Sequence, residues 1–235
     1  APNFNGSSFT TMGDISLSQG ATLTVSGDAA GTVRIRGGQF VITDATLSAD
    51  TGNSPGAQTA IDIKVAGDLL ISDTRGLPVM TATTTGVGDA GAIEINSANL
   101  VASSTSPAPI PFTLIDTHTS GAGRAGDINI TTGNLKASYQ EQGIVWFTDS
   151  GTARLEHGHG GNVTISAQSV TLEKMNITTG DTQATLLNQD ANGSAGNVTI
   201  KGNGTINADK LTLLNSTIDT SALLAGDSAE QAGSV

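Results

Sequence analysis

The sequence predicts an all-β fold: a right-handed parallel β-helix (β-solenoid) with about 28–37 residues per coil and three short strands per coil. Three observations predict it. A glycine-anchored motif recurs along the chain, and two further segments of alternating apolar residues follow each copy. Charged residues are scarce, and Gly, Ser, Thr and Asn take their place, a composition that favours strands and tight turns. Recurrence at a fixed period is typical of stacked repeats, each of which buries its apolar face against its neighbours.

The anchor motif reads Gly-x-Val/Ile-x-Ile. Copies begin at residues 31, 91, 126, 161 and 196, with a variant at 59 and a further start at Gly13. The last four full copies are 35 residues apart, whereas earlier intervals are 18, 28 and 32 residues. We expect one segment over 1–235, less regular over 1–58, with regular coils over 59–235 that start near 59, 91, 126, 161 and 196. We also expect it to be part of a longer chain, with neighbouring coils or subunits covering both ends.

The anchor supplies the first strand of each coil. Alternate side chains of a strand point to opposite faces, and stacked strands lie about 4.8 Å apart. The two apolar residues of each anchor should therefore form two aliphatic columns inside the fold. The expected ladder comprises Ile61, Ile63, Ile93, Ile95, Ile128, Ile130, Val163, Ile165, Val198 and Ile200. The anchor glycine itself should mark a corner, where a positive φ or a close backbone approach is needed.

Two more apolar segments after each anchor supply the second and third strands. The second covers residues 40–42, 69–71, 100–101, 135, 170–172 and 211–213, and the third covers 47–52, 114–121, 177–180 and 218–220. A β-propeller would need four strands in about 40–45 residues, joined by hairpin turns. The Asn-Gly pairs are too irregularly placed for that, so the pattern favours the β-helix.

Composition excludes several classes of partner. Charged residues make up 13% of the chain, about half the usual share, and the formal net charge is −11. Scattered Lys and Arg residues cannot supply the cationic surface that nucleic acids require, so no nucleic-acid partner is expected. No run of about 20 apolar residues is present, so the chain is not expected to be a transmembrane protein. The chain has no cysteine, which permits an oxidising compartment without requiring one.

Several segments carry a family resemblance. Residues 12–27 (MGDISLSQGATLTVSG) and 31–38 (GTVRIRGG) resemble the filamentous haemagglutinin-like exoproteins of two-partner secretion. The turns at 88–95 (GDAGAIEI), 123–130 (GRAGDINI) and 193–200 (GSAGNVTI) resemble them too. The resemblance covers nearly the whole chain, but a complete N-terminal secretion domain is not found in it.

The resemblance implies a large secreted protein of the bacterial cell surface. Such proteins are exported through an outer-membrane transporter β-barrel and form long β-helical fibres in adhesion or biofilm structure. The chain is therefore expected to be a structural shaft with a glycan or cell-surface ligand. Two alternatives remain: a subunit of an extracellular filament that polymerises end to end, and a polysaccharide-active β-helix enzyme.

The histidines are the main candidates for catalysis. His157 and His159 lie in a Gly-His-Gly-like element, which polygalacturonases also contain. Glycoside hydrolysis needs converging carboxylates, and the matching acidic elements are absent, so we expect no enzyme and a loop role for both residues. They could also chelate a transition metal, but no third ligand is evident.

Calcium is the one cofactor that the loops suggest; otherwise none is expected. Asp89, Asp181, Asp190 and Asp227 each lie in a Gly-rich return loop. Calcium takes six or more oxygen ligands, usually from several neighbouring carboxylates, and the nonapeptide repeat of calcium-binding β-rolls is missing. Solvated loop acids are the alternative.

An aromatic and proline-rich patch is the candidate contact surface. Its expected members are Tyr139, Trp146, Phe147, Pro107, Pro109, Pro111 and Phe112. They lie at similar offsets from the anchors at 91 and 126, so stacking should bring them to one flank. Such side chains suit sugar stacking or protein contact. The alternative is that Trp146 and Phe147 fill a gap in the core.

Asparagine recurs at one place in the anchor. Asn162 and Asn197 both follow the anchor glycine directly, and both lie in Asn-x-Ser/Thr sequences. Glycosylation is one interpretation. A ladder of stacked asparagines between coils is the other.

Overall fold

The protein is all-β with parallel strand pairing throughout the part that the structure describes. The structure, a computed structural model, describes residues 11–107, 112–140, 145–149, 158–180, 194–203, 210–220 and 234–235; within 145–149 it describes the side chains at 147 and 148 only. Strands β1 to β18 lie in one larger and one smaller sheet, and their pairings are parallel. These residues include no helix, and so none long and apolar enough to cross a membrane.

The strands fall into three series that alternate along the chain. The first series is β3 (Val33–Gly37), β6 (Thr59–Val65), β9 (Ala92–Ser104), β11 (Ile128–Tyr139), β13 (Val163–Ser166) and β16 (Val198–Lys201). The second is β1 (Ile15–Ser18), β4 (Phe40–Thr43), β7 (Leu69–Asp73), the later parts of β9 and β11, β14 (Ser169–Glu173) and β17 (Lys210–Leu214). The third is β2 (Thr22–Thr24), β5 (Thr46–Ser48), β8 (Met80–Thr81), β10 (Phe112–Asp116), β12 (Val145–Asp149), β15 (Asn176–Thr178) and β18 (Ile218–Asp219).

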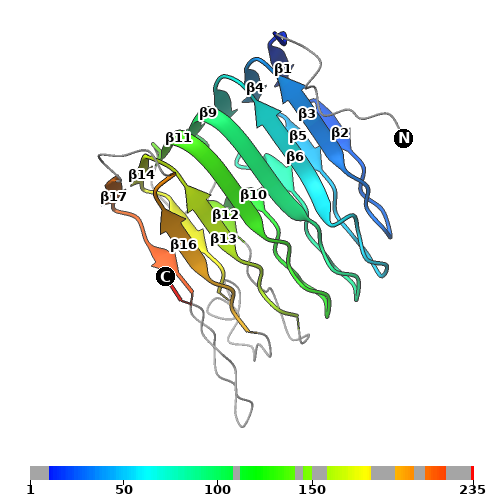
Figure 1. Ribbon diagram of the computed structural model, residues 1–235. Helices are drawn as coiled ribbons and strands as arrows, with labels where there is room; N and C mark the ends of the chain where they lie inside the picture. Colours follow the sequence, from blue (N-terminus) through cyan, green and yellow to red (C-terminus); the bar gives the residue numbers. More distant parts are fainter. Residues whose placement is uncertain are drawn as a thin grey trace.

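Each strand pairs with its counterpart in the next repeat. The first two series form the larger sheet and the third forms the smaller one, in which the order runs from β18 to β2. Figure 1 shows the strands succeeding one another along one direction, from blue β1 to orange β17. Because successive repeats add strands in the same order, a side chain in an inner strand has a counterpart in the repeat before it and in the repeat after it.

The registers place the ladder residues in two columns. One column is Val33, Ile61, Ile93, Ile128, Val163 and Val198; the other is Ile35, Ile63, Ile95, Ile130, Ile165 and Ile200. All are buried except Ile35 and Ile200, which pack partly buried against the same core. The sequence pattern predicts both columns because β-branched side chains at alternate positions fit a pleated, buried surface.

The prediction that Gly13 begins a copy of the anchor motif was wrong. The segment Ile15–Ser18 pairs with Phe40–Thr43, so β1 belongs to the second series and not to the anchor series. Gly13 precedes the anchor Gly31 by 18 residues, about half of a regular repeat, so the segment after Gly13 lies in the second series of strands. Similar sequence motifs therefore occupy two different places in the fold.

Three separate strands are not present in every repeat. In the repeats that begin at 91 and 126, the first and second segments form single strands, β9 with 13 residues and β11 with 12 residues. These two strands pair along almost their whole length.

The anchor glycines are required by close approach of the backbone. A Cβ added at Gly91, Gly126 or Gly196 would overlap the backbone carbonyl of the residue in the preceding repeat (Ala57, Gly91 and Gly161 respectively). No positive φ occurs at these three positions. Of the two reasons that the sequence left open, close approach is the one that applies at these three glycines, whereas a Cβ at Gly31 would make only an ordinary contact with Val25 at 3.6 Å.

Candidate functional site

The polar residues of the described chain mainly bind one another across successive repeats. Six aspartates each accept a hydrogen bond from a main-chain N–H of the following repeat. The pairs are Asp14 with Gln39 (3.0 Å), Asp28 with Asn53 (2.8 Å), Asp44 with Thr74 (2.7 Å), Asp50 with Thr83 (2.9 Å), Asp89 with Arg124 (2.9 Å) and Asp127 with Asn162 (2.7 Å). In all six the carboxylate lies in the earlier repeat, so the bonds share one direction along the stack.

Hydroxyl groups reinforce these contacts. Ser54 donates to the second oxygen of Asp28 at 2.6 Å, and this bond, followed by the N–H of Asn53, lowers the pKa of the Asp28 carboxyl. Asp50 receives hydroxyl hydrogen bonds from Ser48, Thr81 and Thr83 at 2.7–3.0 Å. Hydrogen bonds to a carboxylate favour its ionised form, which is the cause of the lowered pKa at Asp28. Asp50 links Thr81 and Thr83 of the following repeat to its own repeat.

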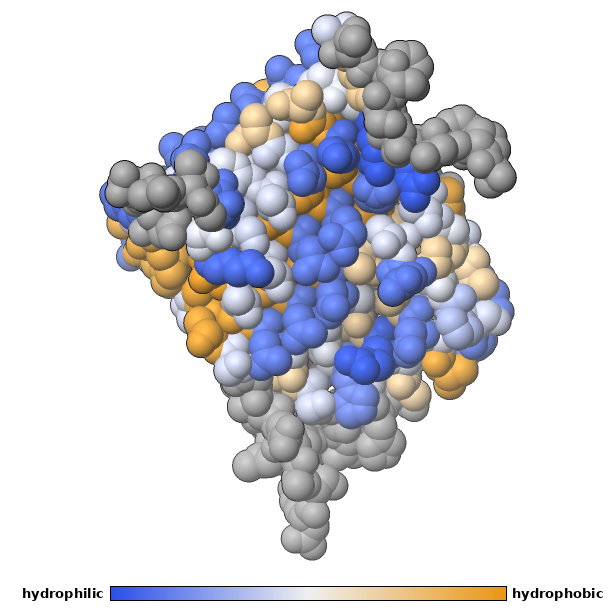
Figure 2. Space-filling view, in the orientation of Figure 1, coloured by the Kyte–Doolittle hydropathy of each residue, from blue (hydrophilic) through white to orange (hydrophobic). Residues whose placement is uncertain are grey.

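An ion cluster lies on the outer face of the first series. Asp62 binds Arg36 at 2.5 Å and Arg34 at 3.0 Å through the same oxygen. Burial raises the pKa of Asp62, but the hydrogen bonds and positive charges of Arg36 and then Arg34 outweigh it and lower the pKa overall. Figure 2 shows hydrophilic residues running along this face of the molecule. The two arginines come from the repeat before Asp62, so the cluster ties these repeats together.

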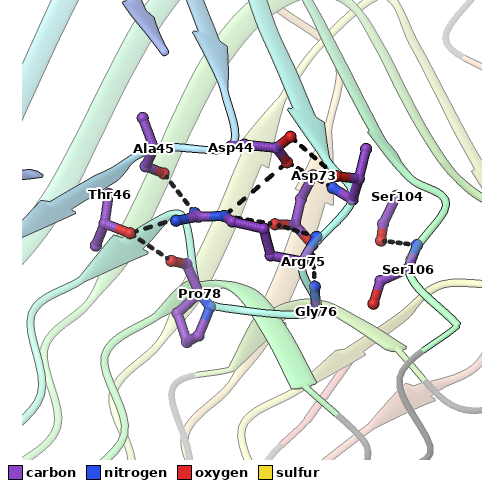
Figure 3. A network of polar contacts seen from close by, with 10 residues as sticks. Asp44, Ala45, Thr46, Asp73, Arg75, Gly76, Pro78, Ser104 and Ser106 are labelled. Carbon is purple, nitrogen blue, oxygen red and sulfur yellow. Dashed lines mark hydrogen bonds and ion pairs between the residues drawn. The ribbon is translucent and has the colours of Figure 1, made fainter. Parts of the chain in front are cut away.

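A second network lies at the corner after β7 (Figure 3). The buried carboxylate of Asp73 accepts hydrogen bonds from the N–H groups of Arg75 (3.3 Å) and Gly76 (2.8 Å), which shapes the turn. The Arg75 guanidinium reaches back to the carbonyl of Ala45 at 3.2 Å and lies 3.9 Å from Asp44. Arg75 therefore joins its own turn to the equivalent turn of the preceding repeat.

Amide side chains form two columns. In one, Asn197 donates to the side-chain oxygen Oδ1 of Asn162 through its main-chain N–H (3.0 Å) and its side-chain amide (3.3 Å), and Asn162 donates likewise to the carboxylate of Asp127. In the other, Asn99 donates to Asp68, Asn134 to Asn99 and Ser169 to Asn134, at 2.7–2.9 Å. The asparagine ladder considered for Asn162 and Asn197 is therefore present, and their amide groups are engaged in it.

Three members of the expected aromatic patch do not lie on the surface. Tyr139, Phe147 and Phe112 are all buried in the core, so the core-filling alternative is correct for Phe147. The rings of Phe112 and Tyr139 meet edge to face at 6.4 Å, and the Tyr139 hydroxyl donates to the Ser106 carbonyl at 2.9 Å.

Phe112 lies in a strand that is covered on both faces, since all five residues of β10 are buried. Pro107 is exposed. Pro109, Pro111 and the Trp146 side chain lie outside the described part of the chain, although the Trp146 backbone pairs with Thr113.

Only some of the histidine and calcium candidates lie in the described part of the chain. His159 is exposed, and its Nδ1 lies 2.7 Å from the Ser194 hydroxyl; His157 lies outside the described residues. Asp89 accepts the Arg124 N–H, whereas Asp181, Asp190 and Asp227 lie outside the described residues. Among the residues that are described, no group of three or more His, Asp or Glu side chains could hold a metal ion.

Sequence reasoning missed the pair formed by His118 and Asp116. The Nδ1 of His118 lies 2.6 Å from a carboxylate oxygen of Asp116, which also accepts the His118 N–H at 3.0 Å. Residues at i and i+2 of an extended segment face the same side, so the spacing of Asp116 and His118 was the available signal. Asp116 is buried and the imidazole is partly exposed, so the carboxylate orients the ring at the end of β10.

Comparison with protein-family models, curated proteins and solved structures finds no match to this chain. The arrangement of polar groups is therefore the basis for any functional conclusion. These groups cross-link neighbouring repeats in series along the stack. Chemically, the arrangement holds strands in register and presents a regular polar face.

Proposed function

We propose that this chain is a segment of a right-handed parallel β-helix that serves as the structural shaft of an exported bacterial surface fibre. The observation that carries the proposal is the shared register of three strand series from one repeat to the next. A connection between parallel strands of one sheet is right-handed in nearly all proteins, which supports the handedness. Adhesion or biofilm scaffolding follows from the family resemblance of the anchors.

The disposition of the polar side chains favours a mechanical role over catalysis. Asp28, Asp50, Asp62 and Asp127 are each bound by donors of an adjacent repeat or their own. A catalytic pair needs carboxylates aimed at a bound substrate. Carboxylates committed to neighbouring strands instead resist the separation of repeats.

The architecture can be tested by distance measurements between spin labels. The chain has no cysteine, so pairs of introduced cysteines take labels without background. Thr199 is paired in turn with Asn129, Glu94 and Arg34, which lie two, three and five repeats away in one outward column. Label separations are expected near 10, 14 and 24 Å, about 4.8 Å for each repeat. Distances that do not rise linearly with repeat number would exclude the shaft.

The adhesive role needs a separate test. The chain is displayed on a non-adherent bacterium, and the mass of cells attached to glass and to glycan-coated plates is measured. Ile130→Asp, which disrupts the stack, is the matched control. We expect attachment with the native chain and loss of attachment with the variant at equal display. Equal attachment in both, or in neither, would refute the adhesive role.

A further inference from the structure

One interior position of the smaller sheet carries a hydroxyl group where its counterparts carry aliphatic side chains. The column that contains it runs Leu47, Met80, Ile115, Thr148, Ile177 and Ile218. Thr148 is fully buried, and its Oγ1 has no hydrogen-bond partner in the described part of the chain. A buried hydroxyl group that forms no hydrogen bond destabilises the folded state.

Other buried threonines show what Thr148 lacks. The hydroxyl groups of Thr84, Thr117 and Thr179 each donate to the main-chain carbonyl of a loop glycine at 2.7 Å. Thr148 lies inside a strand instead, and the side chains beside it in register, Ile115 and Ile177, offer no acceptor. Its hydroxyl group can therefore be satisfied only if water reaches it.

The strand that carries Thr148 is also paired irregularly. On one side β12 follows the register of β10 without a shift. On the other side Trp146 pairs with Asn176 but Thr148 pairs with Ile177, so the register with β15 shifts by one residue. The unmatched residue of β12 is Phe147, which is fully buried. An extra residue in one strand interrupts the hydrogen-bond ladder at that point.

The two defects coincide where β12 (Val145–Asp149) faces β15 (Asn176–Thr178), a contact called here the β12–β15 seam. The other register shift among the described strands lies between β6 and β9, at the buried Ala60, which has no polar side chain. Thr51 is a further buried threonine without a partner, but it lies outside the named strands. Of the described seams, only β12–β15 combines a shifted register with an unsatisfied hydroxyl group.

The larger sheet stays in register across the same two repeats. Strand β11 pairs with β13 and with β14, and neither pairing contains a shift. Asn162 of the later repeat donates its main-chain N–H to Asp127 at 2.7 Å, and Ser169 donates to Asn134 at 2.7 Å. The larger sheet can therefore hold the two repeats together while the smaller sheet parts.

We propose that the smaller sheet opens locally at the β12–β15 seam while the larger sheet acts as the hinge. Opening brings water to Thr148, whose hydroxyl group then gains the hydrogen bonds that it lacks in the closed stack. Segments of low local stability open more often than the rest of a protein. The inference rests on the proposed shaft of stacked repeats and gives that shaft an internal point at which it bends. It does not depend on the adhesive role.

The test is native-state hydrogen exchange of the purified 235-residue chain, followed by mass spectrometry. Amides of β12 are expected to exchange faster than amides of β11, which belongs to the same repeat. Thr148→Val replaces the hydroxyl group by a methyl group and keeps the β-branched shape, so it should reduce the opening constant about tenfold. Thr148→Ser keeps the hydroxyl group and should not slow exchange.

Thr84→Val is the matched control, because Thr84 is equally buried but its hydroxyl group donates to Gly88. The same chemical change removes a hydrogen bond there, so exchange around Thr84 should become faster and exchange in β12 should not change. Melting curves of the native chain and of each variant verify that all are folded.

Three outcomes would overturn this proposal. They are equal exchange in β11 and β12, exchange in β12 that Thr148→Val does not slow, and slower exchange with Thr148→Ser as well. Any of them in a chain whose label distances rise linearly with repeat number would end the seam and leave the shaft standing. Label distances that do not rise linearly would end both.

Discussion

At the scale of single residues, the anchor glycine Gly126 has little room for a side chain. The Cβ of an alanine at Gly126 would overlap the carbonyl of Gly91, which is backbone and cannot move aside as a flexible side chain can. The N–H and carbonyl of Gly126 also bond to Thr117, so this strand cannot shift without breaking further contacts.

Gly126→Ala is expected to destabilise the chain by about 3 kcal/mol, because overpacking against fixed backbone forces neighbouring repeats apart. Gly27→Ala is the matched control, since nothing lies within 4 Å of its added Cβ. That variant should be neutral or slightly stabilising, because alanine has less conformational freedom in the unfolded chain. Denaturant unfolding of both variants checks this, and equal midpoints would contradict it.

Acid should weaken the Asp62 cluster. The pKa of this carboxyl is lowered from its ordinary value of 3.8 in the folded chain. A group of this kind stabilises the fold fully above the unfolded value, and the contribution is lost as the pH falls through the folded pKa. We expect Asp62→Asn to lower the melting temperature near neutral pH, with a difference from the native chain that shrinks as the pH falls below 3.8.

Melting curves at about pH 7 and about pH 2 measure this change. Glu173→Gln, which alters an exposed carboxylate of β14, is the control and should show no such convergence. A difference between Asp62→Asn and the native chain that is the same at both pH values would show that the arginines do not stabilise the ionised form.

Most of the polar contacts could not be predicted from the sequence. The N–H group that each aspartate faces depends on the length of the return loop between them, and those lengths vary. Arg75 reaches Ala45 only because the turn held by Asp73 directs it back along the stack. The asparagine ladder was accessible because Asn162 and Asn197 keep one offset at a constant interval.

At the scale of the strand, the buried columns carry most of the stability. A fully buried aliphatic side chain contributes about 1.5–3 kcal/mol relative to an exposed one. Ile130 lies between Ile95 and Ile165 and is almost wholly buried. Each ladder residue thus stabilises the repeat before it and the repeat after it.

Ile130→Asp is expected to cost about 4 kcal/mol or more, because it buries a charge without a partner. Thr131→Asp changes the next residue, which is exposed and points to the other face. Its effect should stay within about 0.5 kcal/mol. The free energy of unfolding of each variant is the measurement. Similar losses in both would mean that Ile130 does not face the interior of the stack.

Periodicity explains which strands could be predicted. The all-β character, the parallel pairing and the first-series columns follow from alternation and from the interval of 35 residues between anchors. The place of Ile15–Ser18 was mistaken because the anchor motif and the second-series strand have similar patterns. The positions of Phe112 and Tyr139 were misjudged because equal offsets from the anchors place residues on one flank but do not say whether their side chains point inward, and both are buried.

At the scale of the whole molecule, one repeat should be removable as a unit. Deletion of residues 91–125 joins Ala90 to Gly126 and leaves both anchor columns continuous, from Ile61 to Ile128 and from Ile63 to Ile130. Deletion of 91–107 removes about half of a repeat and brings strands of different series together. We expect the first variant to keep a cooperative thermal transition and the second to lose it.

Circular dichroism during heating measures both transitions, since strand content and cooperativity report on the same stack. Loss of folding after the whole-repeat deletion would show that the repeats are not equivalent. Retention of folding after the half-repeat deletion would show that register between series does not matter. The native chain, measured in parallel, gives the reference transition.

The shared direction of the carboxylate bonds bears on how such a protein changes its length over evolution. The main-chain N–H groups of Thr74, Arg124 and Asn162 each donate to an aspartate of the preceding repeat. Between the repeats at 161 and 196 the acceptor is the side-chain amide of Asn162 instead. A duplicated repeat that keeps its acceptor and its N–H donor at these offsets would match its neighbours on both sides, so the length of the stack could change in steps of one period.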